Sequence, residues 1–356
     1  MLKIAYGVQG TGNGHITRAR AMAHAFNQRD DVQVDYFFSG RAAKKYFDME
    51  CFGAYQTYSG LSFVCKRGQV AKWQTVKSQQ YRQFYRDLNA LDLRQYDLVI
   101  NDFEPLTAWA AKRQGIPSLS ISHQAAFSLG APKAGASFID NIIMRFFAPT
   151  DIQLGVHWFH FGKAILPPFI VEQPIDNPTA DKVLVYLPFE SIEDVQAMLE
   201  PISEQPFVCF HPDVQRTHKR QHVEWHPTSQ KAFKQALVNT SGVIANAGFE
   251  LSSEALRLGK KLLLKPLNGQ FEQLSNAQTL RDLNLCDTMY ILDTDSVEEW
   301  LNAENLEPIT FPNNPDILID WLIQKNWDQT EQVCQQLWRQ VKFPDRTRQQ
   351  LMKLAI

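Results

Sequence analysis

Short apolar runs alternate with longer stretches of helical periodicity along most of the chain. The runs predict strands at residues 2–8, 32–39, 96–101 and 117–122 in the first half, and at 183–187, 207–210, 241–246 and 261–265 in the second. Between them, apolar spacing predicts helices, among them residues 105–114 and 250–258. Strands that alternate with helices of this length favour parallel sheets covered by helices. The pattern therefore predicts an α/β fold.

A chain of 356 residues exceeds one ordinary hydrophobic core and indicates two domains. Residues 162–182 contain four prolines and no periodicity, which is typical of a connection. We expect a first Rossmann-like domain over residues 1–162, a linker over 163–182, a second Rossmann-like domain over 183–322, and a helical segment over 323–356, where periodicity predicts a helix at 328–354.

The second half contains a strand, a turn at Gly248 and a helix, which form part of a nucleotide-binding βαβ unit. A glycine at the turn lets backbone amides approach a ligand, and the helix that follows presents free N–H groups and the positive end of its dipole. This arrangement suits a diphosphate. Glu254 lies about one turn into the helix, within reach of ribose hydroxyls. The alternative is an ordinary turn with a glycine cap.

The residues after this turn carry a family pattern: Asn246-Ala-Gly-Phe249, Glu254-Ala255, Leu258-Gly-Lys260, Pro266, Gly269-Gln270, Glu272-Gln273 and Asn276-Ala277. The pattern resembles the donor-binding segment of GT-B glycosyltransferases, in the MurG-like and UDP-glycosyltransferase-like branch. The resemblance implies a GT-B fold, whose last helix crosses back onto the first domain, and a nucleotide-sugar donor, with no cofactor and no metal. It assigns donor binding to Ser191, Asn246, Gly248, Phe249, Glu254, Gln270, Glu272 and Gln273.

The first predicted strand is followed by the loop Gly10-Thr-Gly-Asn-Gly-His15. Its spacing is G-x-G-x-G and no acidic residue closes the second strand, so the loop is weak evidence for NAD. It is similar to the Gly-Thr-Gly-Gly-His loop of MurG-like enzymes, which faces the acceptor. The resemblance implies that His15 is a general base, since an unperturbed histidine pKa near 6.5 suits proton abstraction. The alternative is that His15 only caps the helix.

Ligands of parallel sheets bind at the carboxyl ends of the strands, and this rule places further candidates on the rim of the loop. Asp102, Glu104 and His123 are alternative bases, or one of them orients His15. The residues that we expect to contact the acceptor are Gly12, Asn13, Gly14 and His123.

Charge is divided unevenly along the chain, whose net charge is −2. Residues 1–150 hold 18 Lys and Arg against 11 Asp and Glu, and residues 151–356 hold 18 against 27. A basic first half suggests an anionic partner, although chance composition is an alternative. Aromatic and basic residues interleave over 66–91, which predicts either contact with an anionic membrane or a core-facing helix with a solvated basic face.

Composition limits the location and the partners. Five scattered cysteines without a C-x-x-C pair favour a reducing compartment. The chain shows no signal-peptide pattern and no apolar run of membrane-spanning length. We therefore expect a cytoplasmic protein, which could be peripheral on the inner face of the membrane. No nucleic-acid-binding motif is visible.

Together, these patterns predict transfer of a sugar from a nucleotide-diphosphate sugar to an acceptor hydroxyl. We expect a UDP-sugar as the donor and a lipid-linked or envelope glycan as the acceptor. The resemblance implies an inverting, metal-independent reaction. Two alternatives remain: a nucleotide-sugar 2-epimerase that uses Asp102, Glu104 and His211, and a non-catalytic nucleotide-sugar-binding protein.

Overall fold

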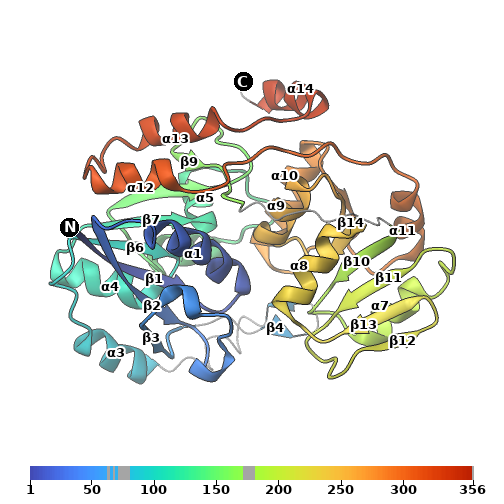
Figure 1. The fold of residues 1–356 in the computed structure, drawn as a ribbon, viewed down its shortest axis with the longest axis horizontal. Coiled ribbons are helices and arrows are strands. Elements are labelled where there is room, and N and C mark those ends of the chain that lie inside the picture. The colour runs from blue at the N-terminus through green and yellow to red at the C-terminus, as the bar shows by residue number, and fades with distance from the viewer. Residues whose placement is uncertain (62–64, 67–68, 71–80, 171–180, 355–356) are drawn as a thin grey trace.

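The computed structural model describes residues 1–61, 65–66, 69–70, 81–170 and 181–354. It contains two seven-stranded sheets, each covered by helices, that lie side by side (Figure 1). This arrangement confirms the predicted GT-B fold of two Rossmann-like domains.

The first sheet has the strand order β3-β2-β1-β6-β7-β8-β9 and is parallel throughout. Its strands are β1 Leu2–Gln9, β2 Val32–Ser39, β3 Tyr55–Tyr58, β6 Leu98–Asp102, β7 Ser118–Ser122, β8 Ile152–Val156 and β9 Ile165–Leu166. The helices of this domain are α1 Asn13–Phe26, α3 Tyr81–Ala90, α4 Pro105–Gln114, α5 His123–Leu129 and α6 Phe138–Phe146, with 3-10 turns η1 Ala43–Lys45 and η2 Glu50–Phe52. A separate antiparallel pair joins β4 Cys65–Lys66 to β5 Gln69–Val70.

The second sheet has the order β12-β13-β11-β10-β14-β15-β16, and its edge strand β12 is antiparallel. Its strands are β10 Lys182–Tyr186, β11 Phe207–Phe210, β12 His218–Arg220, β13 Val223–His226, β14 Thr240–Ala245, β15 Lys261–Leu264 and β16 Asp287–Thr288. Its helices are α7 Ile192–Leu199, α8 Gln230–Val238, α9 Phe249–Arg257, α10 Phe271–Asp282 and α11 Thr294–Leu301.

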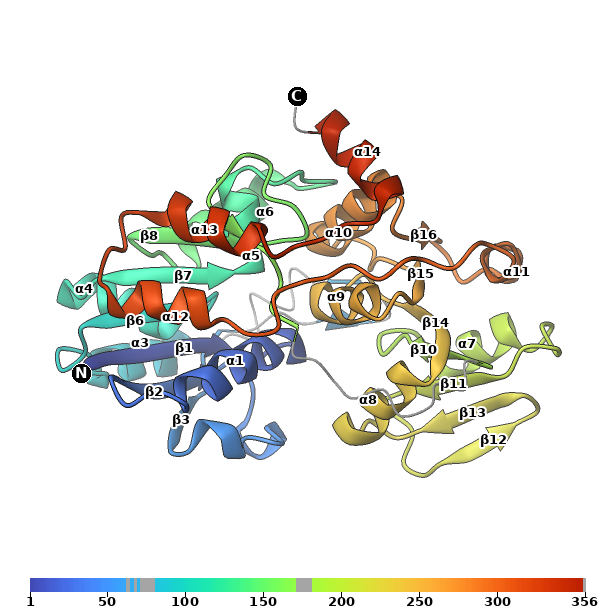
Figure 2. The same ribbon diagram turned by 45° about the horizontal axis from the view of Figure 1, so that its top comes forward.

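The C-terminal segment returns to the first domain, as the resemblance implied (Figure 2). It forms α12 Asp316–Ile323, α13 Thr330–Trp338 and α14 Asp345–Leu354. Asp320 of α12 forms an ion pair of 2.6 Å with Arg29, and the indole of Trp338 donates to the carbonyl of Ile165.

Three boundaries differ from the expected ones. The crossing precedes α12, although we expected the second domain to reach residue 322. Strand β9 extends the first sheet to Leu166, beyond residue 162, because it pairs with β8. The single helix expected at 328–354 is two helices, and Pro344, whose ring cannot continue a helix, lies directly before the second.

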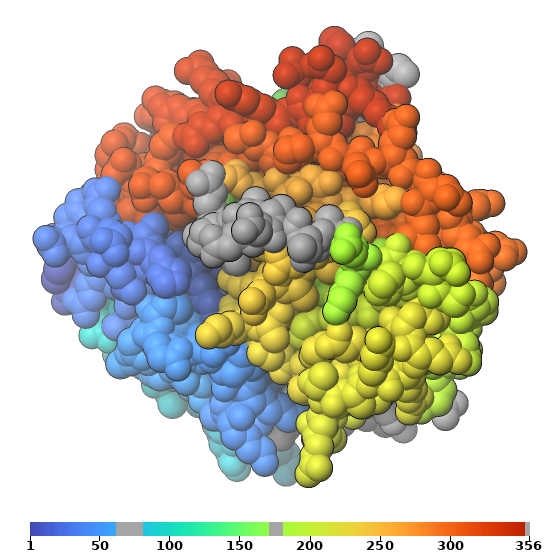
Figure 3. All heavy atoms as spheres, turned by 45° about the vertical axis from the view of Figure 1, so that its right-hand side comes forward, coloured from blue at the N-terminus to red at the C-terminus, as the bar shows by residue number. Residues whose placement is uncertain are grey.

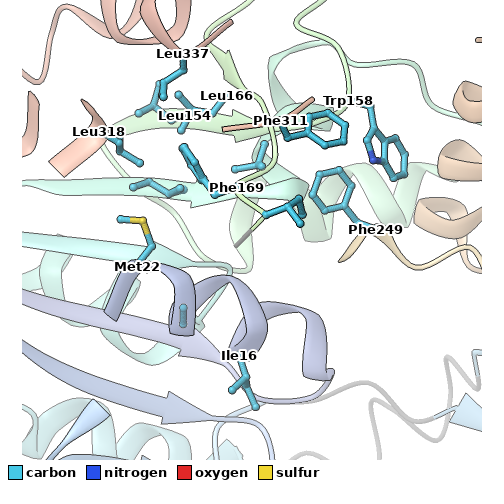
Figure 4. Packing of buried hydrophobic residues seen from close by; sticks show 14 of the residues in the cluster. Ile16, Met22, Leu154, Trp158, Leu166, Phe169, Phe249, Phe311, Leu318 and Leu337 are labelled. Carbon is cyan, nitrogen blue, oxygen red and sulfur yellow. The ribbon is translucent and has the colours of Figure 1, made fainter. Parts of the chain in front are cut away.

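One hydrophobic core runs through both domains. Trp158 of the first domain packs on Phe249 of α9, with ring centroids 4.7 Å apart, and Phe311 lies beside them (Figure 4). The Trp158 indole also donates to the Ser253 hydroxyl at 2.8 Å. Figure 3 shows residues of the first domain, in blue, directly against residues of the second domain, in gold. The two domains are therefore packed together, with the N-terminal ends of α1 and α9 in contact.

Candidate functional site

The predicted base and one predicted carboxylate form a pair. His15 lies in the first turn of α1, which follows β1, and Asp102 ends the neighbouring parallel strand β6. Parallel pairing brings both to one sheet edge, where His15 Nδ1 lies 2.8 Å from Asp102 Oδ1. Burial opposes ionisation of Asp102, but the neighbouring Arg18 and His15 outweigh it and lower the pKa of this carboxyl. Because a carboxylate only accepts, Nδ1 carries the proton and Nε2 remains the basic nitrogen.

The glycine-rich loop permits a close approach of the two domains. A Cβ on Gly14 would lie 3.1 Å from Glu250 Cγ, so a side chain there would press against α9. Gly12 is different, since a Cβ there would meet no atom within 4 Å. Asn13, which replaces a family glycine, accepts two hydrogen bonds from Arg41 at 3.1 Å each. The expected acceptor loop thus has an open tip and a closely packed base.

Glu104 has a structural role as the N-cap of α4. Its carboxylate accepts hydrogen bonds from the backbone N–H groups of Leu106 and Thr107, both at 2.7 Å, and from the Ser39 hydroxyl at 2.5 Å. The side chain is buried, and burial raises the pKa of Glu104. These contacts occupy both carboxylate oxygens, so Glu104 is not placed to act on a substrate in this structure.

His123 lies between the domains, not on an open acceptor surface. Its Nδ1 donates to the carbonyl of Val156 at 2.9 Å, and its Nε2 lies 2.7 Å from Asn276 Oδ1 of the second domain. Its ring stacks on Phe249 with centroids 4.1 Å apart. Burial lowers the pKa of His123, and the side chain is 1% exposed. In this packed state, His123 therefore joins the two domains.

Gly248 is the N-cap of α9 and faces open space. Its φ of −75° is accessible to any residue, and a Cβ there would meet no atom within 4 Å. Neither the backbone nor the packing among the described residues therefore explains this glycine, whereas a ligand at the helix N-terminus would. Glu254 lies half-buried on the same helix, and burial raises its pKa.

Two of the predicted donor residues have buried oxygens without a partner among the described residues. The side-chain amide of Asn246 donates to the carbonyl of Lys265 at 2.8 Å, and this leaves its Oδ1 unsatisfied. Gln270, at the N-cap of α10, has an unsatisfied Oε1. A buried acceptor without a donor costs free energy, so both atoms are suited to hydroxyl or N–H donors of a ligand.

The remaining predicted donor residues have partners within the chain. Gln273 accepts from the backbone N–H of Leu267 at 2.9 Å and shapes the loop before α10. Glu272 accepts from Gln124 of the first domain at 3.0 Å. Ser191, expected at the donor, is the N-cap of α7 and accepts from the backbone N–H of Asp194 at 3.1 Å. The Phe249 side chain is buried between the domains, and only its backbone N–H stays at the helix N-terminus.

The sequence interpretation missed Arg18 and Glu250. Arg18 binds Asp102 through Nε at 2.9 Å and Nη2 at 3.0 Å, and it binds Glu250 Oε1 through Nη1 at 2.6 Å. Its side chain is 5% exposed. The only available signal was that Arg18 follows His15 by three residues, which places both on one face of a helix. Nothing in the sequence indicated that Glu250 lies opposite.

The fold and this site define a GT-B glycosyltransferase. The model of glycosyl transferase family 1 matches residues 2–304, and the chain belongs to this family. No curated protein sequence matches the chain.

Solved structures with the same fold cover nearly the whole chain at low identity. The structure titled LpCGTa in complex with UDP has a TM-score of 0.59 at 13% identity, over 99% of this chain and 98% of that one. Phytolacca americana UGT2, complexed with UDP-2fluoro-glucose and pterostilbene, has a TM-score of 0.58 at 11% identity, over 99% and 98%. MurG of Acinetobacter baumannii has a TM-score of 0.50 at 15% identity, over 99% of both chains.

Within the described residues, no helix combines the length and the apolar character needed to cross a membrane.

Proposed function

We propose that this glycosyltransferase moves a sugar from a UDP-sugar, held by the second domain, to an acceptor hydroxyl on the first domain. The observation that carries the proposal is the His15–Asp102 pair, which lies where the first turn of α1 meets the first turn of α9. A base and a helix N-terminus that face each other provide the two requirements of the reaction. One removes the acceptor proton, and the other stabilises the departing diphosphate.

The proposed reaction is a single inverting displacement. His15 Nε2 takes the proton of the acceptor hydroxyl while the hydroxyl oxygen bonds to the anomeric carbon. The bond between that carbon and the phosphate oxygen breaks, and the electron pair leaves with UDP. Asp102 holds Nδ1–H and stabilises the imidazolium that forms. The free N–H groups and the dipole of α9 stabilise the diphosphate without requiring a metal.

We assign donor binding to groups around the N-termini of α9 and α10. The backbone at Gly248 and Phe249 would hold the diphosphate, and Glu254 would bind the ribose hydroxyls. The unsatisfied oxygens of Asn246 and Gln270 would accept hydrogen bonds from the donor. The neighbours whose titles include UDP and UDP-2fluoro-glucose support a uridine nucleotide.

We further propose a lipid-linked acceptor, with membrane contact through α6. Four large apolar side chains of this nine-residue helix are exposed to solvent: Phe138 at 79%, Ile139 at 57%, Ile142 at 41% and Phe146 at 52%. Arg145 lies beside them on the same helix. The loop before α6 reaches the second domain, where Ala134 N–H donates to the Ser275 hydroxyl. An apolar face with a cation beside the domain interface suits an anionic lipid surface.

Membrane contact through the segment 66–91 stays a prediction, and only part of this segment is described. Helix α3 turns Phe84 and Leu88 into the core and leaves Arg82 and Arg86 exposed, which matches the alternative of a solvated basic face. Residues 71–80, which include Trp73, lie outside the described residues.

A nucleotide panel followed by a transfer assay tests the function. We expect UDP, and not GDP, TDP, CMP or ADP, to raise the melting temperature. With the matching UDP-sugar and a lipid-linked or simple glycan acceptor, His15→Gln should lower kcat by about 10²–10⁴-fold while the Kd for UDP stays unchanged. Inversion would appear in the anomeric NMR signals of the product. Unchanged turnover in His15→Gln would remove His15 from the mechanism.

The same assay separates the alternatives. Conversion of the UDP-sugar without an acceptor would indicate a 2-epimerase, although Glu104 and His211 are buried in different domains. Binding of UDP without any turnover would indicate a non-catalytic protein. For the membrane contact, Phe138→Asp/Ile142→Asp should abolish sedimentation with vesicles of phosphatidylglycerol and phosphatidylethanolamine, and unchanged sedimentation would refute a role of α6.

A further inference from the structure

Arg18 contacts both halves of the proposed site through charged groups. Its guanidinium is buried and uses three nitrogens on two carboxylates from different domains. Asp102 reaches it from β6, Glu250 from α9, and His15 from its own helix, with Arg18 Nη2 3.4 Å from His15 Nδ1. Tyr6 of β1 is the buried phenol beside this group. Arg18 is not needed as a proton donor or acceptor in the proposed reaction.

We infer that Arg18 is a positioning residue, which fixes the carboxylate of Asp102 behind His15. Glu250 of the second domain in turn fixes the guanidinium of Arg18. The His15–Asp102 pair is therefore fully held in place only while the two domains are packed together. The inference rests on the proposed function, because it assumes that His15 acts on an acceptor. It adds a link from the donor-binding helix to the base on the acceptor side.

The geometry requires the packed state. Asp102 receives two nearly parallel hydrogen bonds from Nε and Nη2, which fix the plane of its carboxylate. The third nitrogen, Nη1, has its partner on α9, 232 residues away in the sequence. Gly14 permits this contact, because any larger residue would press against Glu250. Separation of the domains would leave one edge of the guanidinium without its partner.

Charge balance explains why the two carboxylates are not equivalent. One guanidinium lies between two buried carboxylates, and Asp102 takes two of its three short contacts. Burial works against the charge of Arg18, but both carboxylates raise its pKa. For Glu250, burial raises the pKa to about 7, against the opposing effect of Arg18 and with a further contribution from Asp102. Asp102 thus stays ionised behind His15, while Glu250 can hold Arg18 with or without a proton.

The first test reads the ring of His15 without any substrate. In Arg18→Gln, Asp102 loses its cation and His15 loses a neighbouring positive charge, so the imidazolium becomes more favourable. The midpoint of the His15 NMR titration should rise relative to the wild type. Arg20→Gln is the matched control, because Arg20 lies on the same helix but binds the carbonyls of Phe47 and Asp48. Equal midpoints in the Arg18 and Arg20 variants would overturn the inference.

Arg18→Lys covers the case in which Arg18→Gln does not fold. Lysine keeps the charge but cannot form the paired contacts of the guanidinium. Because the charge is kept, we expect a kcat reduced at least tenfold without the rise in the His15 midpoint, and with the Kd for UDP unchanged. An unchanged kcat in Arg18→Lys would show that the paired contacts do not position Asp102.

The second test separates two contributions of Glu250: the hydrogen bond that it accepts from Arg18 and the negative charge of its carboxylate. Glutamine keeps an oxygen that accepts from Arg18 Nη1, whereas alanine removes it. With the donor and acceptor found by the panel, Glu250→Gln should keep kcat within about threefold, and Glu250→Ala should lose at least tenfold at unchanged KM. Equal kcat in both variants would contradict the link between the domains. If the wild type transfers no sugar, the proposed function fails, and the His15 titration still decides whether Arg18 acts on the pair.

Discussion

Replacement of Glu250 by glutamine tests which of two opposing effects controls this carboxylate. Burial disfavours its charge, and the ion pair of 2.6 Å with Arg18 favours it. Glutamine has the shape of the protonated acid, so the substitution removes the charge and keeps the packing. The side chain is 16% exposed, and solvent therefore screens it little.

The size of the effect follows from the pKa. The rise of the Glu250 pKa from 4.5 to about 7 corresponds to a change of about 3 kcal/mol in the free energy of unfolding, at about 1.4 kcal/mol per pH unit. Because the pKa is raised in the folded state, the folded protein binds this proton more tightly than the unfolded chain does. The associated stability is fully present below pH 4.5 and is lost as the pH rises through 7. Solvent and movement of nearby groups make this value an upper bound.

The measurement compares urea unfolding of the wild type and Glu250→Gln at pH 5, 6, 7 and 8, followed by tryptophan fluorescence. Titrating groups that do not interact with Glu250 cancel in the difference between the two proteins. The free energies of unfolding of the two proteins should be nearly equal at pH 5, and the variant should be more stable by up to about 3 kcal/mol at pH 8. A wild type that is the more stable protein at pH 8 would refute this reasoning, since it would show that the ion pair with Arg18 outweighs the cost of burial.

Three further substitutions test the domain interface and the donor site. Phe249→Ala should destabilise the protein by about 3–5 kcal/mol in urea unfolding, because the ring is buried between Trp158 and His123; a loss below 1 kcal/mol would contradict this packing. Gly14→Ala should displace the Glu250 side chain and lower the melting temperature, whereas Gly12→Ala, whose Cβ meets no atom of the described residues, should not; equal melting temperatures of the two variants would contradict the close approach of α1 to α9. Glu254→Ala should weaken UDP binding by about 2–3 kcal/mol, or at least 30-fold in Kd by calorimetry; an unchanged Kd would remove Glu254 from the site.

Buried strands and capped helices were predictable from the sequence. The bounds 32–39, 105–114 and 207–210 agree with β2, α4 and β11 residue for residue. Strands of a covered parallel sheet read as continuous apolar runs, and α4 lies between a Glu-Pro start and a left-handed Gly115. The edge strand β12 was missed because all three of its residues are exposed and polar. Strand β9 has only two residues, too few for any period.

The pairing of His15 with Asp102 was within reach of sequence reasoning because it follows from topology. Both residues stand at carboxyl ends of predicted parallel strands, and such ends share one edge. The pairing of Arg18 with Glu250 was not within reach, because contact between α1 and α9 depends on how the two domains pack against each other. That packing is set by surfaces and by the crossing of α12 and α13, which no local pattern describes.

The family pattern predicts the backbone at Phe249 but not the direction of its side chain. The family pattern identified a turn and a helix N-terminus, and the structure has both. Successive residues of a helix point about 100° apart, so the side chains of the first turn diverge although their N–H groups share one direction. Phe249 accordingly enters the core beside Trp158, while Glu250 reaches Arg18. A pattern that fixes the backbone of this turn can therefore propose its amides as diphosphate ligands, but the direction of each side chain depends on what the other domain presents.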